Sequence, residues 1–146
     1  MEPGAHLEQF VGRYLPEVAA VGRAVVARLR QRLPGCDVLV YDNYNALAVA
    51  FSPNGKTSNA FLSVAHYPRW VSLFMNARLD DPEGLLKGSG STLRHVVLKA
   101  ATDLDSPGLA ALIDQAIATA GVPPMDPRQG QLLIKSVSAK QRPRRK

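Results

Sequence analysis

Residues 59–100 read NAFLSVAHYPRWVSLFMNARLDDPEGLLKGSGSTLRHVVLKA. This stretch contains three short segments rich in β-branched and aromatic residues, separated by turns that contain proline, glycine and serine, which is the pattern of consecutive strands. We expect strands at about residues 59–66, 70–76 and 93–99, with a turn and a short helical segment at 80–86 before the last of them. These strands predict the middle of an antiparallel sheet, around which the rest of the chain is interpreted.

Side chains alternate between the two faces of a strand, so residues 70–76 divide into two sets. Val71, Leu73 and Met75 form a continuous apolar face, whereas Trp70 and Phe74 point the other way. Helices must cover the Val/Leu/Met side for a two-layer domain to bury its core, which leaves Trp70 and Phe74 on the open side. The segment 46–51 also has alanines on one face, so the sequence predicts a shallow groove. The alternative is that the C-terminal segment or a second subunit covers the rings.

The rest of the chain supplies the second layer. Helices are expected from the i, i+3, i+4 spacing of apolar residues, and hairpin strands from short β-branched runs. These elements are an N-terminal helix around residues 7–14, a helix at 16–33, strands at 38–41 and 46–51, a helix at 107–120 and a strand at 131–137. The predicted fold is α+β, a two-layer sandwich with N-terminal helices, an antiparallel sheet of about 4–6 strands and a C-terminal helix.

Composition and length limit the classes of protein to which the chain can belong. The 146 residues are 46% hydrophobic and 21% charged, values typical of one soluble domain. No run reaches the roughly 18 apolar residues of a spanning helix, and the N-terminus lacks the basic and apolar regions of a secretory signal. We therefore expect a cytoplasmic protein without a membrane partner. Cys36 is the only cysteine, which excludes an internal disulfide and a multi-cysteine zinc site.

The net charge of +6 is unevenly distributed along the chain. Residues 1–127, the predicted domain, carry 11 Lys/Arg and 12 Asp/Glu, whereas the basic segment 128–146 carries 7 Lys/Arg and no acid. Chain ends of this kind are commonly mobile, and we expect mobility after the strand at 131–137. Binding of nucleic acid is not expected on this distribution, except for weak non-specific contact of the basic tail with phosphates.

Several short motifs together resemble a known family. They are VYDNYNAL at residues 40–47, YPR at 67–69, DP at 81–82, GLL at 84–86, GSG at 88–90 and LRH at 93–95. They resemble the YdhG-like bacterial domain family, which is largely uncharacterised and whose fold is similar to frataxin. The resemblance covers residues 6–121 and extends into the basic tail. One relative is described as an intracellular iron chaperone, and frataxins use an acidic ridge for iron and the open sheet face, bearing a tryptophan, for an iron–sulfur scaffold partner.

The iron function implied by this resemblance transfers poorly. Iron as a hard cation needs clustered oxygen ligands, and the helical N-terminal third holds three glutamates against five arginines. The nearest substitute is Asp80, Asp81 and Glu83, although Asp81-Pro82 fits a turn initiator better. No metal or cofactor is expected, and iron chaperoning through these three residues is the alternative.

The Gly/Ser loop Lys87, Gly88, Ser89 and Gly90 invites a phosphate interpretation, because glycines let backbone N–H groups approach an anion. A P-loop, however, places lysine after its second glycine and leads into a helix, whereas here the lysine comes first and a strand follows. A tight turn is favoured. A small-molecule or anion-binding enzyme at residues 88–95 is kept as an alternative.

No catalytic constellation is present in the sequence, so a binding domain is favoured over an enzyme. His66 and His95 would supply acid–base chemistry only if their strands bring them together. The leading hypothesis is a non-enzymatic domain that binds a protein partner or a small ligand on the open sheet face, with a homodimer as a further alternative. The expected site residues are Trp70, Phe74, Tyr67, Arg69, Tyr44, His66, Arg94 and His95.

Overall fold

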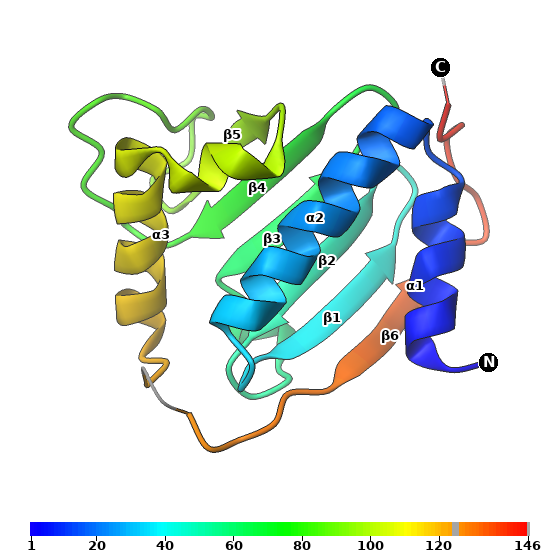
Figure 1. Cartoon of the computed structure of the whole chain (residues 1–146), viewed down its shortest axis with the longest axis horizontal. Helices are drawn as coiled ribbons and strands as arrows, with labels where there is room; N and C mark the ends of the chain where they lie inside the picture. Colours follow the sequence, from blue (N-terminus) through cyan, green and yellow to red (C-terminus); the bar gives the residue numbers. More distant parts are fainter. Residues whose placement is uncertain (124–125, 146) are drawn as a thin grey trace.

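The computed structural model describes residues 1–123 and 126–145, which form three helices and one six-stranded sheet (Figure 1). The helices are α1 (Pro3–Gly12), α2 (Pro16–Arg32) and α3 (Pro107–Ala120). The strands are β1 (Asp37–Asp42), β2 (Leu47–Ser52), β3 (Leu62–His66), β4 (Val71–Asn76), β5 (Leu93–Leu98) and β6 (Leu132–Val137). Two short 3-10 helices, η1 (Thr57–Asn59) and η2 (Ala101–Asp105), lie in the connections. The predicted α+β class is confirmed.

The sheet is mixed, with strand order β5-β4-β3-β2-β1-β6. Strands β1 to β5 pair with antiparallel neighbours, as the sequence predicts. β6 instead pairs in parallel with the outer side of β1, so the expectation of a purely antiparallel sheet is wrong for this one strand. The reason is the route of the chain, since the connection after α3 returns to the end of the sheet where β1 begins (Figure 1). The pairing is interrupted by a bulge at Lys135, which has no partner in β1.

All three helices lie on one face of the sheet, and together they bury a single hydrophobic core (Figure 1). Most strand residues that alternate onto this face are buried, and Val49, Phe51 and Leu73 are completely so. α3 contributes Leu109, Leu112, Ile113 and Ala116, the stripe that its apolar periodicity predicts. None of α1, α2 and α3 covers the opposite sheet face, which we call the open face (Figure 1).

The helix ends follow the local sequence signals. Each helix has proline in its first turn, where the missing N–H costs no hydrogen bond. α1 ends at Gly12 and α2 begins at Pro16, so the break predicted before Pro16 is present. α3 is closed by Gly121 in the left-handed conformation, with φ 73°. Within the described residues, none of the helices combines the length and the apolar character that a membrane crossing needs.

The residues after β6, for which the sequence predicts mobility, lie against the domain. The N–H of Ser138 donates to the Asp42 carbonyl and that of Arg142 to the Tyr44 carbonyl, both at 2.9 Å. Arg144 is only 6% exposed. The cause is tertiary: once β6 pairs with β1, the following residues run beside the β1–β2 turn and reach acceptors there. The last tail residue, Lys146, lies outside the described residues.

Candidate functional site

Aromatic rings gather on the open face, and they come from the strands that the sequence identified as central. Trp70, just before β4, is 44% exposed and stacks on Tyr67, with ring centroids 4.8 Å apart and planes 18° apart. Phe74 on β4 lies opposite His95 on β5, with ring centroids 4.9 Å apart. The structure therefore brings four of the expected site residues together as two neighbouring ring pairs.

A pocket of about 470 Å³ lies beside these rings, at the end of the open face formed by the β1–β2 turn. Its floor consists of small residues of β2 and β3, and Tyr44, Tyr67 and Phe74 stand around it. Its complete lining is Asn43, Tyr44, Asn45, Ala46, Ala48, Ser63, Ala65, Tyr67, Phe74 and Ser138. Because alanine and serine project so little from a sheet, the flanking rings create the depth of this groove. Tyr44, which sequence reasoning placed here, is 45% exposed.

Positive charges border the open face. The guanidinium of Arg142, from the C-terminal segment, lies 5.6 Å from the centre of the Tyr44 ring, within cation–π range. Lys87 is bridged to His95, and residues opposite each other in an antiparallel pair point to the same face. Arg69 is exposed in the turn that precedes Trp70. Arg142 was missed as a site residue, because only the pairing of β6 brings the tail to this place.

His66 does not belong to the open face, which corrects its assignment as a binding residue. Its side chain lies on the same side of β3 as Leu62 and Val64, which faces the helices, and it is fully buried. Burial lowers the pKa of His66 to about 4, so the ring is neutral and its Nδ1–H donates to the Leu47 carbonyl at 3.0 Å. His66 and His95 lie on opposite faces with β4 between their strands, so the proposed acid–base pair does not form.

Arg94 also lies on the helical side. It is paired with Met75, which faces the core, whereas the next residue, His95, is paired with Phe74 on the open face. Its Nε is buried and has no hydrogen-bond partner among the described residues. Its charge acts on Asp81, whose pKa is lowered first by the N–H of Leu86 and to a smaller extent by Arg94. Arg94 is therefore not at the rim of the groove.

The Gly/Ser loop is a turn that folds back onto β5. The Lys87 N–H donates to the His95 carbonyl at 2.7 Å, and the His95 N–H donates to the Lys87 carbonyl at 3.0 Å. Gly88 has φ 111°, a conformation that side chains disfavour, and a Cβ on Gly90 would lie 2.9 Å from the Leu93 carbonyl oxygen. The glycines, with Ser89 between them, are thus explained by the turn itself.

The acidic residues 80–83 are also engaged in local structure. Both carboxylate oxygens of Asp81 accept backbone N–H groups, from Leu85 and Leu86, each at 2.9 Å. This corrects the short helix expected at 80–86, which is a turn without helical hydrogen bonding. Glu83 lies beside Gly108 at the start of α3, apart from Asp80, whose backbone pairs with Gln115. Within residues 1–123 and 126–145, no three His, Cys, Asp or Glu side chains are grouped to hold a metal.

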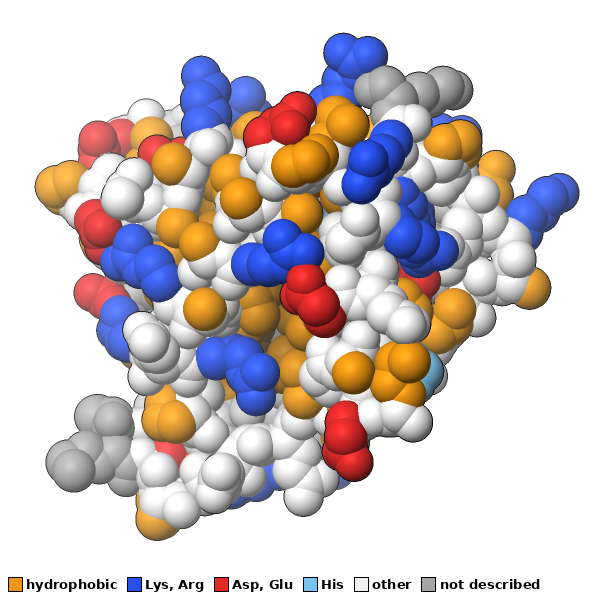
Figure 2. Space-filling model, turned by 45° about the vertical axis from the view of Figure 1, so that its right-hand side comes forward, with side chains coloured by type: hydrophobic (Ala, Val, Ile, Leu, Met, Phe, Trp, Pro, Cys, Tyr) orange, Lys and Arg blue, Asp and Glu red, His pale blue; other side chains and the backbone are white. Residues whose placement is uncertain are grey.

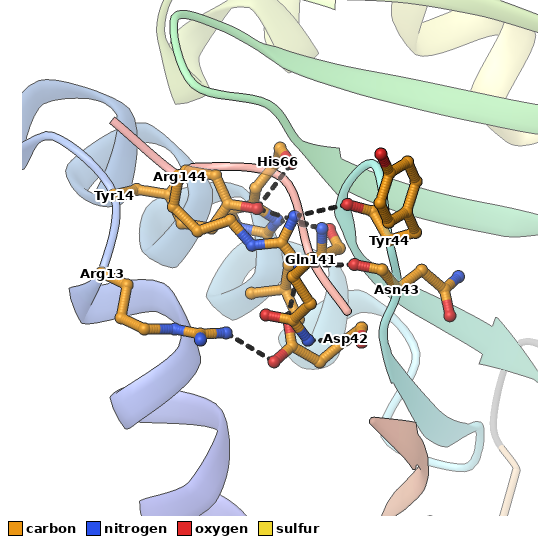
Figure 3. Close-up of polar contacts among 9 residues, drawn as sticks. Arg13, Tyr14, Asp42, Asn43, Tyr44, His66, Gln141 and Arg144 are labelled. Carbon is orange, nitrogen blue, oxygen red and sulfur yellow. Dashed lines mark hydrogen bonds and ion pairs between the residues drawn. The ribbon is translucent and has the colours of Figure 1, made fainter. Parts of the chain in front are cut away.

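A buried polar cluster behind the β1–β2 turn escaped sequence reasoning (Figure 3). Asp42, 1% exposed, binds Arg144 at 2.9 Å and Arg13 at 2.5 Å. Tyr14 donates its O–H to the His66 carbonyl and accepts the Leu47 N–H, and burial raises the pKa of its phenol. Asp42 lies on the same side of β1 as the core residues Val38 and Val40, so alternation in the sequence indicates a buried carboxylate that needs a positively charged partner. Its partner Arg144, 102 residues away, carried no local signal.

Comparison of the chain with protein-family models, with curated proteins and with solved structures found no significant match.

Proposed function

We propose that the chain is a small binding domain without catalytic activity, and that it binds its ligand or partner on the open face. The observation that carries this proposal is the exposed ring of Trp70, stacked on the half-buried Tyr67, beside the pocket that Tyr67 lines together with Tyr44 and Phe74. None of these four rings belongs to the hydrophobic core, which lies on the other side of the sheet, and two of them, Trp70 and Tyr44, are exposed. Exposed aromatic patches of this kind are typical of interaction sites.

The family resemblance supports the same surface. The motifs at residues 40–47 and 81–95 resemble the YdhG-like family, and frataxins bind a protein partner through an open sheet face that bears a tryptophan. α1 and α2 carry the acids Glu8 and Glu17 against four arginines, so the acidic ridge that binds iron in frataxins has no counterpart on these two helices. Binding on the sheet face is therefore the part of the resemblance that this proposal uses.

Fragment binding followed by amide chemical shifts tests the proposal. Aromatic and heteroaromatic fragments are expected to shift the amides of Ala48, Ser63 and Phe74, and these shifts should disappear in Trp70→Ala combined with Tyr44→Ala. Val137→Ala is the matched control, since Val137 is 54% exposed on the outer strand β6 and lies outside this pocket. Fragments that consistently select another surface, or no surface, would contradict the proposal.

Self-association is measured in parallel, because two copies joined through their open faces would also cover the rings. Sedimentation velocity across a range of protein concentrations reports the oligomeric state. A dimer that dissociates in Trp70→Ala would identify the partner as a second copy of this chain, whereas a dimer insensitive to this change would use another surface.

A further inference from the structure

We propose that the occupant of the open face is a single-stranded nucleic acid, whose bases stack on Trp70, Phe74 and Tyr44 while its phosphates are bound by the cations at the border of the face. This inference rests on the proposed function and specifies the ligand class. Three features carry it: the separation of charge between the two sides of the sheet, the arrangement of the rings, and the position of the C-terminal segment.

The helical side of the molecule is electrically mixed. Figure 2 shows Lys and Arg side chains across this side with Asp and Glu between them. Several of these arginines are paired with carboxylates, and the pairs are Arg23–Glu8, Arg28–Asp105 and Arg32–Asp114. A polyanion would therefore find little uncompensated positive charge on the helices.

The open face differs in charge. The strand positions that alternate onto it, from Asp37 on β1 to Ser136 on β6, are apolar, aromatic or small polar residues apart from Asp37 and His95. Asp37, the one acid among them, is 3% exposed and bound to Arg128 at 2.5 Å. Within the part of the chain that the structure describes, Lys87 and Arg142, which border this face, form no ion pair. The open face thus combines cations with no free carboxylate, which is the charge pattern that complements phosphates.

The rings on this face suit nucleobases. Proteins that bind single strands stack successive bases on aromatic side chains and accompany the backbone with positive charge. Here Trp70 and Tyr67 already stack nearly parallel, and the outer surface of Trp70 is accessible. Tyr44 carries Arg142 over its ring, so a base on the other side of Tyr44 would extend an existing cation–π stack. The floor of alanine and serine leaves room for bases between the rings.

The basic tail lies against the domain in the structure, with the Arg142 N–H donating to the Tyr44 carbonyl. Parallel pairing of β6 with β1 directs residues 138–145 past the β1–β2 turn, and Ser138 lines the pocket itself. Arg144 anchors this segment through Asp42 and thereby holds Arg142 beside Tyr44. The cations and the rings belong to one surface rather than to two.

The same features favour a single strand over a duplex and over an acidic protein. Paired bases in a duplex are stacked internally and offer no free ring face to Trp70. An acidic protein segment would use the cations but gain little from a floor of alanine and serine with separate aromatic platforms. Both are retained as competing outcomes in the experiment.

The experiment measures the anisotropy of a fluorescein-labelled single-stranded RNA and DNA of mixed sequence, about 12 nucleotides long, a length within the usual site sizes of such domains. The full chain is titrated at low and moderate salt. Trp70→Ala should weaken binding by about tenfold, the loss expected for one stacked base. Arg142→Ala should weaken it about threefold or more and reduce the salt dependence by roughly one counterion. Arg30→Ala removes the same charge from the helical side, where Arg30 is exposed, and should leave the affinity within about twofold of the wild type.

The outcomes separate this inference from the proposed function. Loss of affinity in both face variants with little effect of Arg30→Ala supports the inference. The inference is overturned if the affinity for the oligonucleotide is unchanged in Trp70→Ala but is lost when residues 138–146 are deleted, because the tail alone would then bind phosphates. Tighter binding of a duplex, or Trp70-dependent binding of a poly-glutamate peptide in place of the oligonucleotide, also overturns it. If no oligonucleotide binds while fragments still shift the pocket amides, the ligand class is wrong and the proposed function stands; if neither binds, both are wrong.

Discussion

The guanidinium of Arg144 donates to the carboxylate of Asp42 at 2.9 Å, and both side chains are almost completely buried. The same Arg144 group also donates to the Asn43 carbonyl at 2.6 Å, while its charge lies 5.7 Å from the centre of the Tyr14 ring (Figure 3). One residue near the C-terminus therefore joins the end of β1, the β1–β2 turn and the α1–α2 corner. The pair positions the C-terminal segment beside the open face.

Replacing Arg144 with alanine is expected to lower the free energy of unfolding by about 3 kcal/mol, because it leaves the buried Asp42 carboxylate with Arg13 alone. Urea denaturation followed by circular dichroism measures the change. Arg145→Ala is the matched control: Arg145 is exposed, donates only to carbonyls of Gly12 and Arg13, and should cost less than about 1 kcal/mol. Equal losses in the two variants would contradict a special role of the buried pair.

The buried His66 predicts a loss of stability in acid. Its pKa falls from 6.5 to about 4 in the folded protein, with burial as the main cause, so the unfolded chain takes up more protons between these pH values. Stability should therefore decrease by about 3 kcal/mol as the pH falls from 6.5 to 4. In His66→Asn, which keeps a donor for the Leu47 carbonyl, this part of the pH dependence should disappear. A variant with the wild-type pH profile would show that other groups are responsible.

Gly22 lies against the same histidine, and this contact explains why α2 contains a glycine. A Cβ at position 22 would lie 2.1 Å from His66 Nε2, whose ring is held in the core. Gly22→Ala should therefore destabilise the fold by about 2 kcal/mol, although alanine favours a helix. Gly4→Ala in α1 is the control, since no atom beyond its chain neighbours and the nearby backbone of its own helix lies within 4 Å of the added methyl group, and stability should stay the same or rise. An unchanged melting temperature for Gly22→Ala would mean that the His66 ring can move away from the added methyl group without cost.

Cys36 should be chemically inert in the native protein. It is 2% exposed, and burial raises the pKa of its thiol to about 11, so almost no thiolate is present at neutral pH. A thiol-reactive chromophore at pH 8 should label the folded chain slowly and the urea-unfolded chain rapidly. Fast labelling of the native state would indicate frequent local opening near Gly35 and Gly130.

Much of the candidate site could be predicted because it depends on local alternation. Val71, Leu73 and Met75 identify the buried side of β4, and this places Trp70 and Phe74 on the other side without further information. The same reasoning, applied to Leu62 and Val64 or to Val96 and Leu98, would have moved His66 and Arg94 to the helical side. The chemistry of these two side chains and their proximity in sequence to Trp70 and Phe74 favour a place in the site, whereas the alternation of their own strands directs them to the helical side.

The sequence by itself determined the order of helices and strands, the helix ends at Pro16 and Gly121, and the two faces of the central strands, because each of these depends on neighbours within a few residues. Only the tertiary structure decided that β6 pairs in parallel with β1, that Arg144 reaches Asp42, and that Arg142 lies over Tyr44. These contacts join residues about a hundred positions apart, and their free energy arises from burial and pairing that exist only after the sheet has formed. For this reason the basic tail, which the sequence presents as a loose end, is part of the surface that carries the proposed function.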